Sequence, residues 1–464
     1  MSDLSQTPEL PEKDEHKVSR ILYIFEAAFE YFISILVGGA YLAKVTTSIG
    51  MSDSLTGILS SFVSLGCGFQ IIAIFLAGKQ PVKRWVTVLH TLNQLCFALI
   101  YVVPFVEIPQ AAKIAIFIIF LLLGHALNNV VNSPKINWFM GHVDDKKRGG
   151  FTAKKEIVSL MGGVAFSFLI GQVIDHYEAA GNLTYAFVFC GVGIFILTVL
   201  HSLTLIFTKE IPAKTQERPA IRQMFSELRK DKGLFKIILV SVLWNVAHYA
   251  TTPFYGTYQV KELGFSMTFV ALLSALYSVC RACFSLPMGK FADKYSFTKM
   301  LNVCFIIVLA AFGINMFTNP SNGKVLYTIY YMLYAVAMAG INSGAINLIY
   351  DYVGHERRVS ALALKSTLSG FAGFFTTLLV SLLVEDIQRR GNSFLGMHVY
   401  AQQVVSGIGF LVVVGILVYL NTVIRRMRSR PVLDEPTEMT AEEGTPVEDL
   451  TEANEDTETH ENLI

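Results

Sequence analysis

Long apolar runs separated by short polar breaks constrain this chain of 464 residues more than any other feature of its sequence. A helix needs about 20 mostly apolar residues to cross the roughly 30 Å hydrocarbon core of a bilayer. Twelve runs qualify, and because they are continuous rather than alternating, they predict helices and not the strands of a barrel. We therefore predict an all-α membrane protein with twelve transmembrane helices. Their expected limits are Arg20–Ala43, Ser54–Ala77, Trp85–Val106, Ala111–Met140, Lys154–Asp175, Thr184–Phe207, Leu234–Gln259, Met267–Met288, Lys299–Thr318, Val325–Tyr350, Ala361–Val384 and Val399–Ile424.

Charge and cysteine content narrow the class of protein further. Hydrophobic residues make up 53% of the chain and charged residues 16%, whereas a soluble domain carries roughly 25% charged residues. The basic residues lie between apolar runs and not on one surface, which argues against nucleic acid as a partner. All 6 cysteines fall inside predicted spans and indicate packing, so we expect no disulfide, no metal site and no cofactor.

Lys and Arg residues predict the orientation of the spans. If both termini lie on one side, 29 of the 37 basic residues fall in loops on that side, 6 on the other side and 2 within spans. The positive-inside rule then predicts a multi-pass protein of the plasma or inner membrane with both termini in the cytoplasm. Residues 431–464 hold 12 acidic residues and no Lys or Arg, which predicts a disordered acidic tail.

An internal repeat divides the chain into two halves. Six residues recur 210 positions later in the sequence: Val143 and Val353, Arg148 and Arg358, Ala153 and Ala363, Lys155 and Lys365, Ser159 and Ser369, and Gly163 and Gly373. Two parallel repeats of six spans predict a pseudo-twofold axis along the membrane normal, with a solute site between the halves. The expected parts are a cytoplasmic N-terminal segment (1–19), a six-helix bundle (20–207), a cytoplasmic central loop (208–233), a second six-helix bundle (234–424) and the acidic tail (425–464).

The segment after the eighth span carries a recognisable run of residues. Gly289, Asp293 and Lys294 lie in the run GKFADKYS, which resembles the loop signature of the major facilitator superfamily. In the earlier copy of this signature Val82 stands in place of the acid. The twelve spans and the six-plus-six repeat also resemble this superfamily, across residues 17–430. The resemblance implies an alternating-access transporter in which Gly289, Asp293 and Lys294 form a gating loop.

Polar residues recur at helical spacing within several spans. Because polar side chains are costly in lipid, they usually face the interior of a bundle or a wet cavity. The candidates for lining a solute cavity are Glu30, His125, Asn128, Asn132, Lys135, Asn245, His248, Tyr255, Gln259, Tyr331, Tyr334 and Asn342. Hydrogen bonding between helices, or plain packing of the tyrosines, is the alternative. The resemblance implies that the first, fourth, seventh and tenth spans line the central cavity, and these are the spans that hold the candidates.

Two acids lie four residues apart in the first span. Glu26 and Glu30 occupy one helix face, and two carboxylates a turn apart can exchange a proton, which is the chemistry that proton coupling needs. Apart from basic residues at the ends of spans, which are counted with the loops, Lys135 and Arg281 are the only basic residues inside predicted spans, and they are the expected counter-charges. Glu26, Glu30 and Arg281 are therefore the candidates for proton coupling. For Glu26 the alternative is an ion pair with Arg20 at the membrane interface.

Other polar residues have simpler interpretations. We expect His90 to hydrogen-bond to neighbouring amides in packing, and Lys155 and Lys365 to anchor the cytoplasmic interface. Pro253 in the seventh span removes a backbone donor and predicts a bend.

These features predict a secondary transporter. It would move a small polar solute, sugar-like or a carboxylate, by alternating access as a symporter with protons. The expected partners are this small molecule, protons and the lipid bilayer, and the expected state is a monomer. No G-x-x-x-x-G-K-[ST] run predicts ATP binding, and no H-E-x-x-H pair predicts an enzyme. The alternatives are a non-transporting sensor or scaffold on a transporter fold and an exporter of drugs or metabolites.

Overall fold

The computed structural model describes residues 15–76, 82–143, 148–210, 231–353, 358–394 and 396–427. Most of the predicted central loop, of the N-terminal segment and of the acidic tail lies outside these ranges. The first half of the earlier copy of the loop signature, residues 78–81, also lies outside them.

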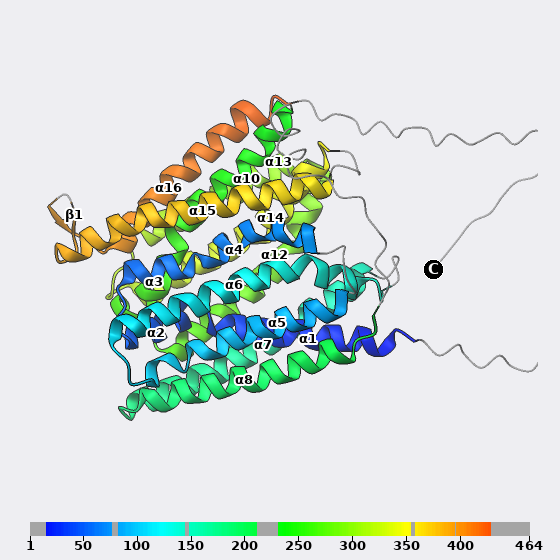
Figure 1. Cartoon of the computed structure of the whole chain (residues 1–464). Coiled ribbons are helices and arrows are strands. Elements are labelled where there is room, and N and C mark those ends of the chain that lie inside the picture. The colour runs from blue at the N-terminus through cyan, green and yellow to red at the C-terminus, as the bar shows by residue number, and fades with distance from the viewer. Residues whose placement is uncertain are drawn as a thin grey trace, which may run out of the picture. The chain divides into compact units, whose positions relative to one another are not determined.

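Helices make up almost all of the described chain, and Figure 1 shows the long ones lying side by side. The first group consists of α1 (Lys17–Leu36), α2 (Gly39–Ser48), α3 (Asp53–Ser60), α4 (Phe62–Leu76), α5 (Val82–Ile100), η1 (Val103–Phe105), α6 (Gln110–Met140), α7 (Arg148–Ala179) and α8 (Leu183–Phe207). The second group consists of α10 (Lys232–Thr251), η3 (Thr252–Phe254), α11 (Tyr255–Thr257), η4 (Tyr258–Glu262), α12 (Met267–Lys294), α13 (Phe297–Asn315), α14 (Gly323–Tyr350), α15 (Arg358–Arg389), α16 (Ala401–Tyr419) and η6 (Leu420–Ile424). A short antiparallel pair, β1 (Ser393–Phe394) and β2 (Met397–His398), connects α15 to α16.

Length and hydropathy support fewer spans than the sequence predicted. Within the described ranges 9 helical segments are long and apolar enough to cross a membrane, or 10 if the bent pair α1–α2 is one span. The segments that do not qualify are α3, α4 and α5. The described part of α4 has 15 residues, and α5 carries Lys83, Arg84, His90, Asn93 and Gln94, which lower its hydropathy.

The first predicted span is broken. α1 and α2 are bent by 46° relative to each other, at a break followed by Gly39, whose φ of +52° favours glycine. The hydroxyl of Tyr101 donates to the carbonyl oxygen of Leu36 at 2.7 Å, which satisfies an acceptor at the end of α1. The apolar run continues through the break, so the sequence alone predicts a single helix here.

The seventh predicted span changes helix type at the proline that the sequence singled out, although Lys232–Glu262 still qualifies as one span. α10 ends at Thr251, and Pro253 lies in the 3₁₀ turn η3. Proline lacks the N–H that would donate to the carbonyl oxygen of Tyr249 four residues earlier. The hydroxyl of Thr377 on α15 donates to that oxygen instead, at 2.7 Å.

Elements from before and after the central loop meet closely where α2 packs against α11. A Cβ added at Gly256 would lie 2.5 Å from the carbonyl oxygen of Gly39, so the two backbones touch. Asp175 near the end of α7 accepts hydrogen bonds from the first two backbone N–H groups of α12, at 2.6 and 2.7 Å. Asp53 on α3 forms an ion pair with Lys261. These contacts hold the two groups of helices together at this end.

Candidate functional site

A cluster of charged side chains lies buried between α1 and α6. Glu26 is fully buried and Lys135 is 2% exposed, while the side chain of Glu30 is 23% exposed. The Lys135 ammonium lies 2.9 Å from Oε1 of Glu26 and also donates to Oε2 of Glu30. Lys135 therefore bridges two carboxylates that lie one helical turn apart.

Two histidines complete this cluster. His90 of α5 places Nε2 3.0 Å from the Lys135 ammonium, and its Nδ1 lies 3.2 Å from Oδ1 of Asn93. Because an ammonium only donates, this geometry fits a neutral His90 that carries its proton on Nδ1. His201 of α8 places Nε2 3.2 Å from Oε1 of Glu26. We call Glu26, Glu30, His90, Lys135 and His201 the charge cluster.

Two members of the charge cluster, His90 and His201, have contacts that the sequence did not predict. His90 does meet the amide of Asn93, as expected, but it also faces Lys135. His201 was missed because it is an isolated polar residue in a strongly apolar helix. Its spacing of three from Thr198 and Thr204, both buried, is the signal that marks this inward face.

The charge cluster includes the ligand types of a metal site. One atom each of Glu26, His90 and His201 lies within 4.8 Å of the others. The Lys135 ammonium lies 2.9 Å from Oε1 of Glu26 and 3.0 Å from Nε2 of His90. A metal ion would need to approach these same atoms to about 2.0–2.2 Å. With Lys135 in place, a fixed positive charge already occupies that position, so these residues do not fit a metal.

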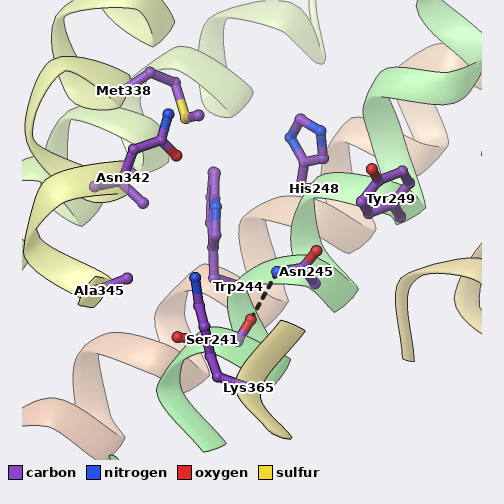
Figure 2. A pocket seen from close by; sticks show the side chains of 10 residues that line it. Ser241, Trp244, Asn245, His248, Tyr249, Met338, Asn342, Ala345 and Lys365 are labelled. Carbon is purple, nitrogen blue, oxygen red and sulfur yellow. Dashed lines mark hydrogen bonds between the residues drawn. The ribbon is translucent and has the colours of Figure 1, made fainter. Parts of the chain in front are cut away.

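A second polar region lies in the later helices. A cavity of about 160 Å³ lies between α10, α14 and α15, and Figure 2 shows its lining. The residues that line it are Ser241, Trp244, Asn245, His248, Tyr249, Met338, Ile341, Asn342, Ala345 and Lys365. We call this space the α10–α14–α15 cavity. Of the predicted lining residues, Asn245, His248 and Asn342 are found here, whereas Trp244 and Lys365 were not predicted.

Other predicted residues of the seventh and tenth spans lie outside this lining. Tyr255 hydrogen-bonds through its hydroxyl to Ser406 of α16 at 2.8 Å. Gln259 donates to the hydroxyl of Tyr327 at 2.6 Å. Tyr334 contacts the cavity indirectly, because its hydroxyl lies 2.5 Å from Nδ1 of His248. In this conformation these polar groups join helices to one another, as the alternative interpretation of the stripes proposed.

The predicted stripe of the fourth span is divided along α6. Lys135 belongs to the charge cluster, whereas His125 is 7% exposed and packs edge-on against the ring of Phe97. Asn128 and Asn132 are partly buried. The Oδ1 atom of Asn128 is buried and makes no hydrogen bond with the described residues.

Comparison with known proteins places the chain in a family. The profile of the Major Facilitator Superfamily matches residues 23–377 and, in a second match, 259–445. The chain belongs to the major facilitator superfamily. A match that covers more than half of the chain agrees with the resemblance noted in the loop signature.

One curated superfamily relative is an uncharacterized MFS-type transporter of Methanocaldococcus jannaschii. It is 26% identical over 202 residues, which cover 41% of this chain and 48% of the relative. The match thus spans about half the length of that relative.

Solved structures of transporters share the fold. A nucleoside transporter, NupG, in a mutant form, has a TM-score of 0.69 and 14% identity, over 87% of this chain and 99% of that chain. A bacterial metal transporter has a TM-score of 0.61 and 12% identity, over 88% of this chain and 97% of that chain. A D-xylose-proton symporter has a TM-score of 0.59 and 13% identity, over 87% of this chain and 96% of that chain. The chain therefore has the superfamily fold and is a multi-pass membrane protein.

The superfamily signature lies on a helix in this protein. Gly289, Asp293 and Lys294 belong to the last two turns of α12, which continues to Lys294, so the expected loop is helical. Asp293 is exposed, and within the described ranges it makes no hydrogen bond or ion pair. The ammonium of Lys294 lies 5.4 Å from the ring centroid of Tyr295.

Arg281 lies apart from the acids that it was expected to balance. Its side chain on α12 is exposed and lies beside Tyr277 and Tyr31. Tyr331 packs against Tyr277 with ring centroids 5.2 Å apart. In the described part of the chain Arg281 pairs with neither Glu26 nor Glu30, and Lys135 alone compensates these two carboxylates.

Proposed function

We propose that this protein is a secondary transporter that moves a small polar solute by alternating access and couples that movement to protons through the charge cluster. Its superfamily and fold support the first part of this proposal. The composition of the charge cluster supports proton coupling, because its carboxylates and histidines can bind one proton at a site that is mostly buried in the protein.

The transmembrane arrangement in this proposal has twelve spans. α3 with α4, and α5 with η1, are the two that fall short by length or hydropathy, and each occupies a predicted apolar run. The proposal keeps the division into bundles at 20–207 and 234–424, with both termini in the cytoplasm. The excess of basic residues on one side of the spans supports this orientation.

Charge balance is the argument for proton coupling. With both carboxylates ionised, Lys135 protonated and both histidines neutral, the charge cluster carries a net charge of −1. Enclosing an unbalanced charge is costly in a medium of low dielectric. Binding of one proton makes the net charge zero, so the proton favours conformations that seal the charge cluster from water. Release of the proton favours conformations that open it.

Proton transfer also needs access to water and a receiving group. Glu30 provides the access, because 23% of its side chain is exposed while the side chains of Glu26 and His90 are fully buried. Two buried atoms, Oε2 of Glu26 and Nδ1 of His201, make no hydrogen bond with the described residues. Each of them can accept a proton without breaking an existing contact.

The solute belongs to one of several classes of small polar molecule. The fold neighbours include proteins described as a nucleoside transporter and a D-xylose-proton symporter, and the amides of the α10–α14–α15 cavity suit hydroxylated or amide-bearing solutes. A volume of about 160 Å³ is smaller than the roughly 300–1,000 Å³ of pockets for drug-sized ligands. This favours a metabolite over export of large drugs.

The experiment that tests proton coupling replaces Glu30 with glutamine. In proteoliposomes with an imposed pH gradient, Glu30→Gln should abolish accumulation of the solute against its gradient while exchange of internal for external solute continues. The control is Glu385→Gln, which removes a carboxylate that is 48% exposed on α15. Full accumulation by Glu30→Gln would remove this residue from the mechanism. A protein that binds solute and exchanges none would be a sensor and not a transporter.

A further inference from the structure

The α10–α14–α15 cavity contains one cationic group and no anionic one. Lys365 extends from α15, and Figure 2 shows its nitrogen directed into the cavity beside the Trp244 ring. None of the 10 side chains drawn around this space belongs to Asp or Glu. Within the described ranges, no carboxylate lies within the 4.0 Å of an ion pair from Lys365. An ammonium in such a place lacks the counter-charge that buried charges usually have.

The equivalent lysine of the first half, Lys155, has a side-chain partner within the protein. Lys155 and Lys365 are equivalent in the 210-residue repeat. The Lys155 ammonium lies 4.8 Å from the ring centroid of Tyr23 and donates to its hydroxyl at 3.3 Å. Lys365 has no such contact in the described chain, although it occupies the equivalent position of the repeat. Its charge is therefore available to a solute.

The remaining lining restricts the shape of that solute. Trp244 presents an indole ring, which favours stacking with a planar group. Both ring nitrogens of His248 are engaged, Nδ1 with Tyr334 at 2.5 Å and Nε2 with the Thr252 hydroxyl at 3.2 Å. The imidazole is therefore already engaged, and the amides of the lining can supply hydrogen bonds to a solute. Asn342 is exposed to the cavity and makes no hydrogen bond with the described residues.

The second amide is partly used. Asn245 donates one hydrogen bond from Nδ2 to the carbonyl oxygen of Ser241 at 3.0 Å, so its oxygen and its second N–H remain available. Lys365, Trp244 and the two amides together match a ring that carries an acid group and its own donors and acceptors.

From this lining we infer that the solute is a small organic anion, a heteroaromatic monocarboxylate whose acid group pairs with Lys365 and whose ring lies against Trp244. This inference rests on the proposed function and names its substrate class. It differs from the sequence-based expectation that Lys365 anchors the protein at the membrane interface. A carboxylate here forms a charge-assisted bond in a partly dehydrated site.

Matched pairs of compounds test the charge requirement. Nicotinate and nicotinamide, benzoate and benzamide, and orotate and 6-methyluracil differ mainly in the acid group. Binding to the purified full-length protein is measured by calorimetry and by quenching of tryptophan fluorescence. In at least one of the two heteroaromatic pairs we expect the acid to bind tenfold or more tightly than its neutral partner. Equal binding within both of these pairs, no binding of either heteroaromatic acid, or a preference confined to benzoate would overturn the inference.

Variants of Lys365 test the residue. Lys365→Gln should reduce the preference for the acid to about onefold while binding of the neutral partner stays unchanged, and Lys365→Arg should keep most of the preference. Lys154→Gln, which removes an exposed charge from α7, should keep it fully. Thermal unfolding identifies variants that fail to fold. If folded Lys365→Gln kept the full preference, Lys365 would not be the anion-binding group.

Transport measurements separate this inference from the proposed function. If the acids bind through Lys365 but never cross the membrane of proteoliposomes, the anion site stands and the transporter proposal fails. If the protein accumulates neutral solutes and ignores the acids, the transporter proposal stands and the anion site is wrong.

Discussion

Replacing Lys135 with methionine should destabilise the protein strongly, because this ammonium is the only counter-charge of Glu26 and Glu30 in the described structure. Lys135 is 2% exposed, and its Nζ contacts Oε1 of Glu26 at 2.9 Å and Nε2 of His90 at 3.0 Å. Removing one partner of a buried ion pair costs about 3–5 kcal/mol. At about 1.4 kcal/mol for each factor of ten, this loss should increase the unfolding equilibrium constant by a factor between about one hundred and several thousand.

Reversible unfolding in mixed micelles of dodecyl maltoside and SDS, followed by far-UV circular dichroism, measures this change. The decisive comparison is a triple variant, Lys135→Met with Glu26→Gln and Glu30→Gln. It has no buried charge to compensate and should recover at least half of the lost stability, because the loss comes from stranded carboxylates and not from the missing side chain. Lys154→Met is the control and should stay within about 0.5 kcal/mol of the parent. A triple variant as unstable as Lys135→Met alone would refute the charge-compensation argument.

Two substitutions test the closed end between α2 and α11. Asp175→Asn removes a charged acceptor from the first turn of α12, and since hydrogen bonds to charged groups contribute about 1.5–3 kcal/mol, we expect the population open at this end to rise about tenfold or more. Gly256→Ala places a methyl group 2.5 Å from the backbone of Gly39, and overpacking of about 1–3 kcal/mol should shift the population the same way. Distances between spin labels on α2 and α11 report both effects. Gly193→Ala, which meets nothing within 4 Å, should leave them unchanged, and unchanged distances in all three would contradict the closure argument.

Apolar patterning predicted a mostly helical membrane protein because burial in lipid leaves a long and continuous signal. It predicted breaks only where a residue forces one. Pro253 was identified because proline cannot donate, and the free carbonyl of Tyr249 does receive another donor. The break between α1 and α2 was not predicted, since Gly38 and Gly39 permit a bend without requiring it. The close approach of the Gly39 backbone to Gly256 is a tertiary contact that the local sequence does not reveal.

Contacts between residues far apart in the sequence were harder to predict than the placement of nearby residues on one helix face. The separation of four residues placed Glu26 and Glu30 on one helix face, but their distances to Lys135, Arg281 and His201 depend on how helices pack. Lys135 lies 105 positions from Glu30 and contacts it, whereas Arg281 does not. Sequence reasoning could only name both bases as candidates.

Depth within the membrane was ambiguous for Lys365. α15 has 32 residues, more than the roughly 20 needed to cross the hydrocarbon core, so its first turns fit an interfacial position as well as an internal one. A lysine there can extend toward headgroups or toward a cavity with equal ease. The neighbouring Trp244, which comes from α10, settles the direction in the structure.

The two cationic sites cannot exchange roles. Lys135 is already bonded to two carboxylates and a histidine, so a solute anion that approached it would meet an excess of negative charge. Lys365 has no carboxylate beside it in the described cavity, so it attracts an anion without displacing another one. The hypothesis of a carboxylate solute, one of the classes expected from the sequence, therefore depends on Lys365. In the proposed mechanism, Lys135 instead sets the charge that one bound proton balances.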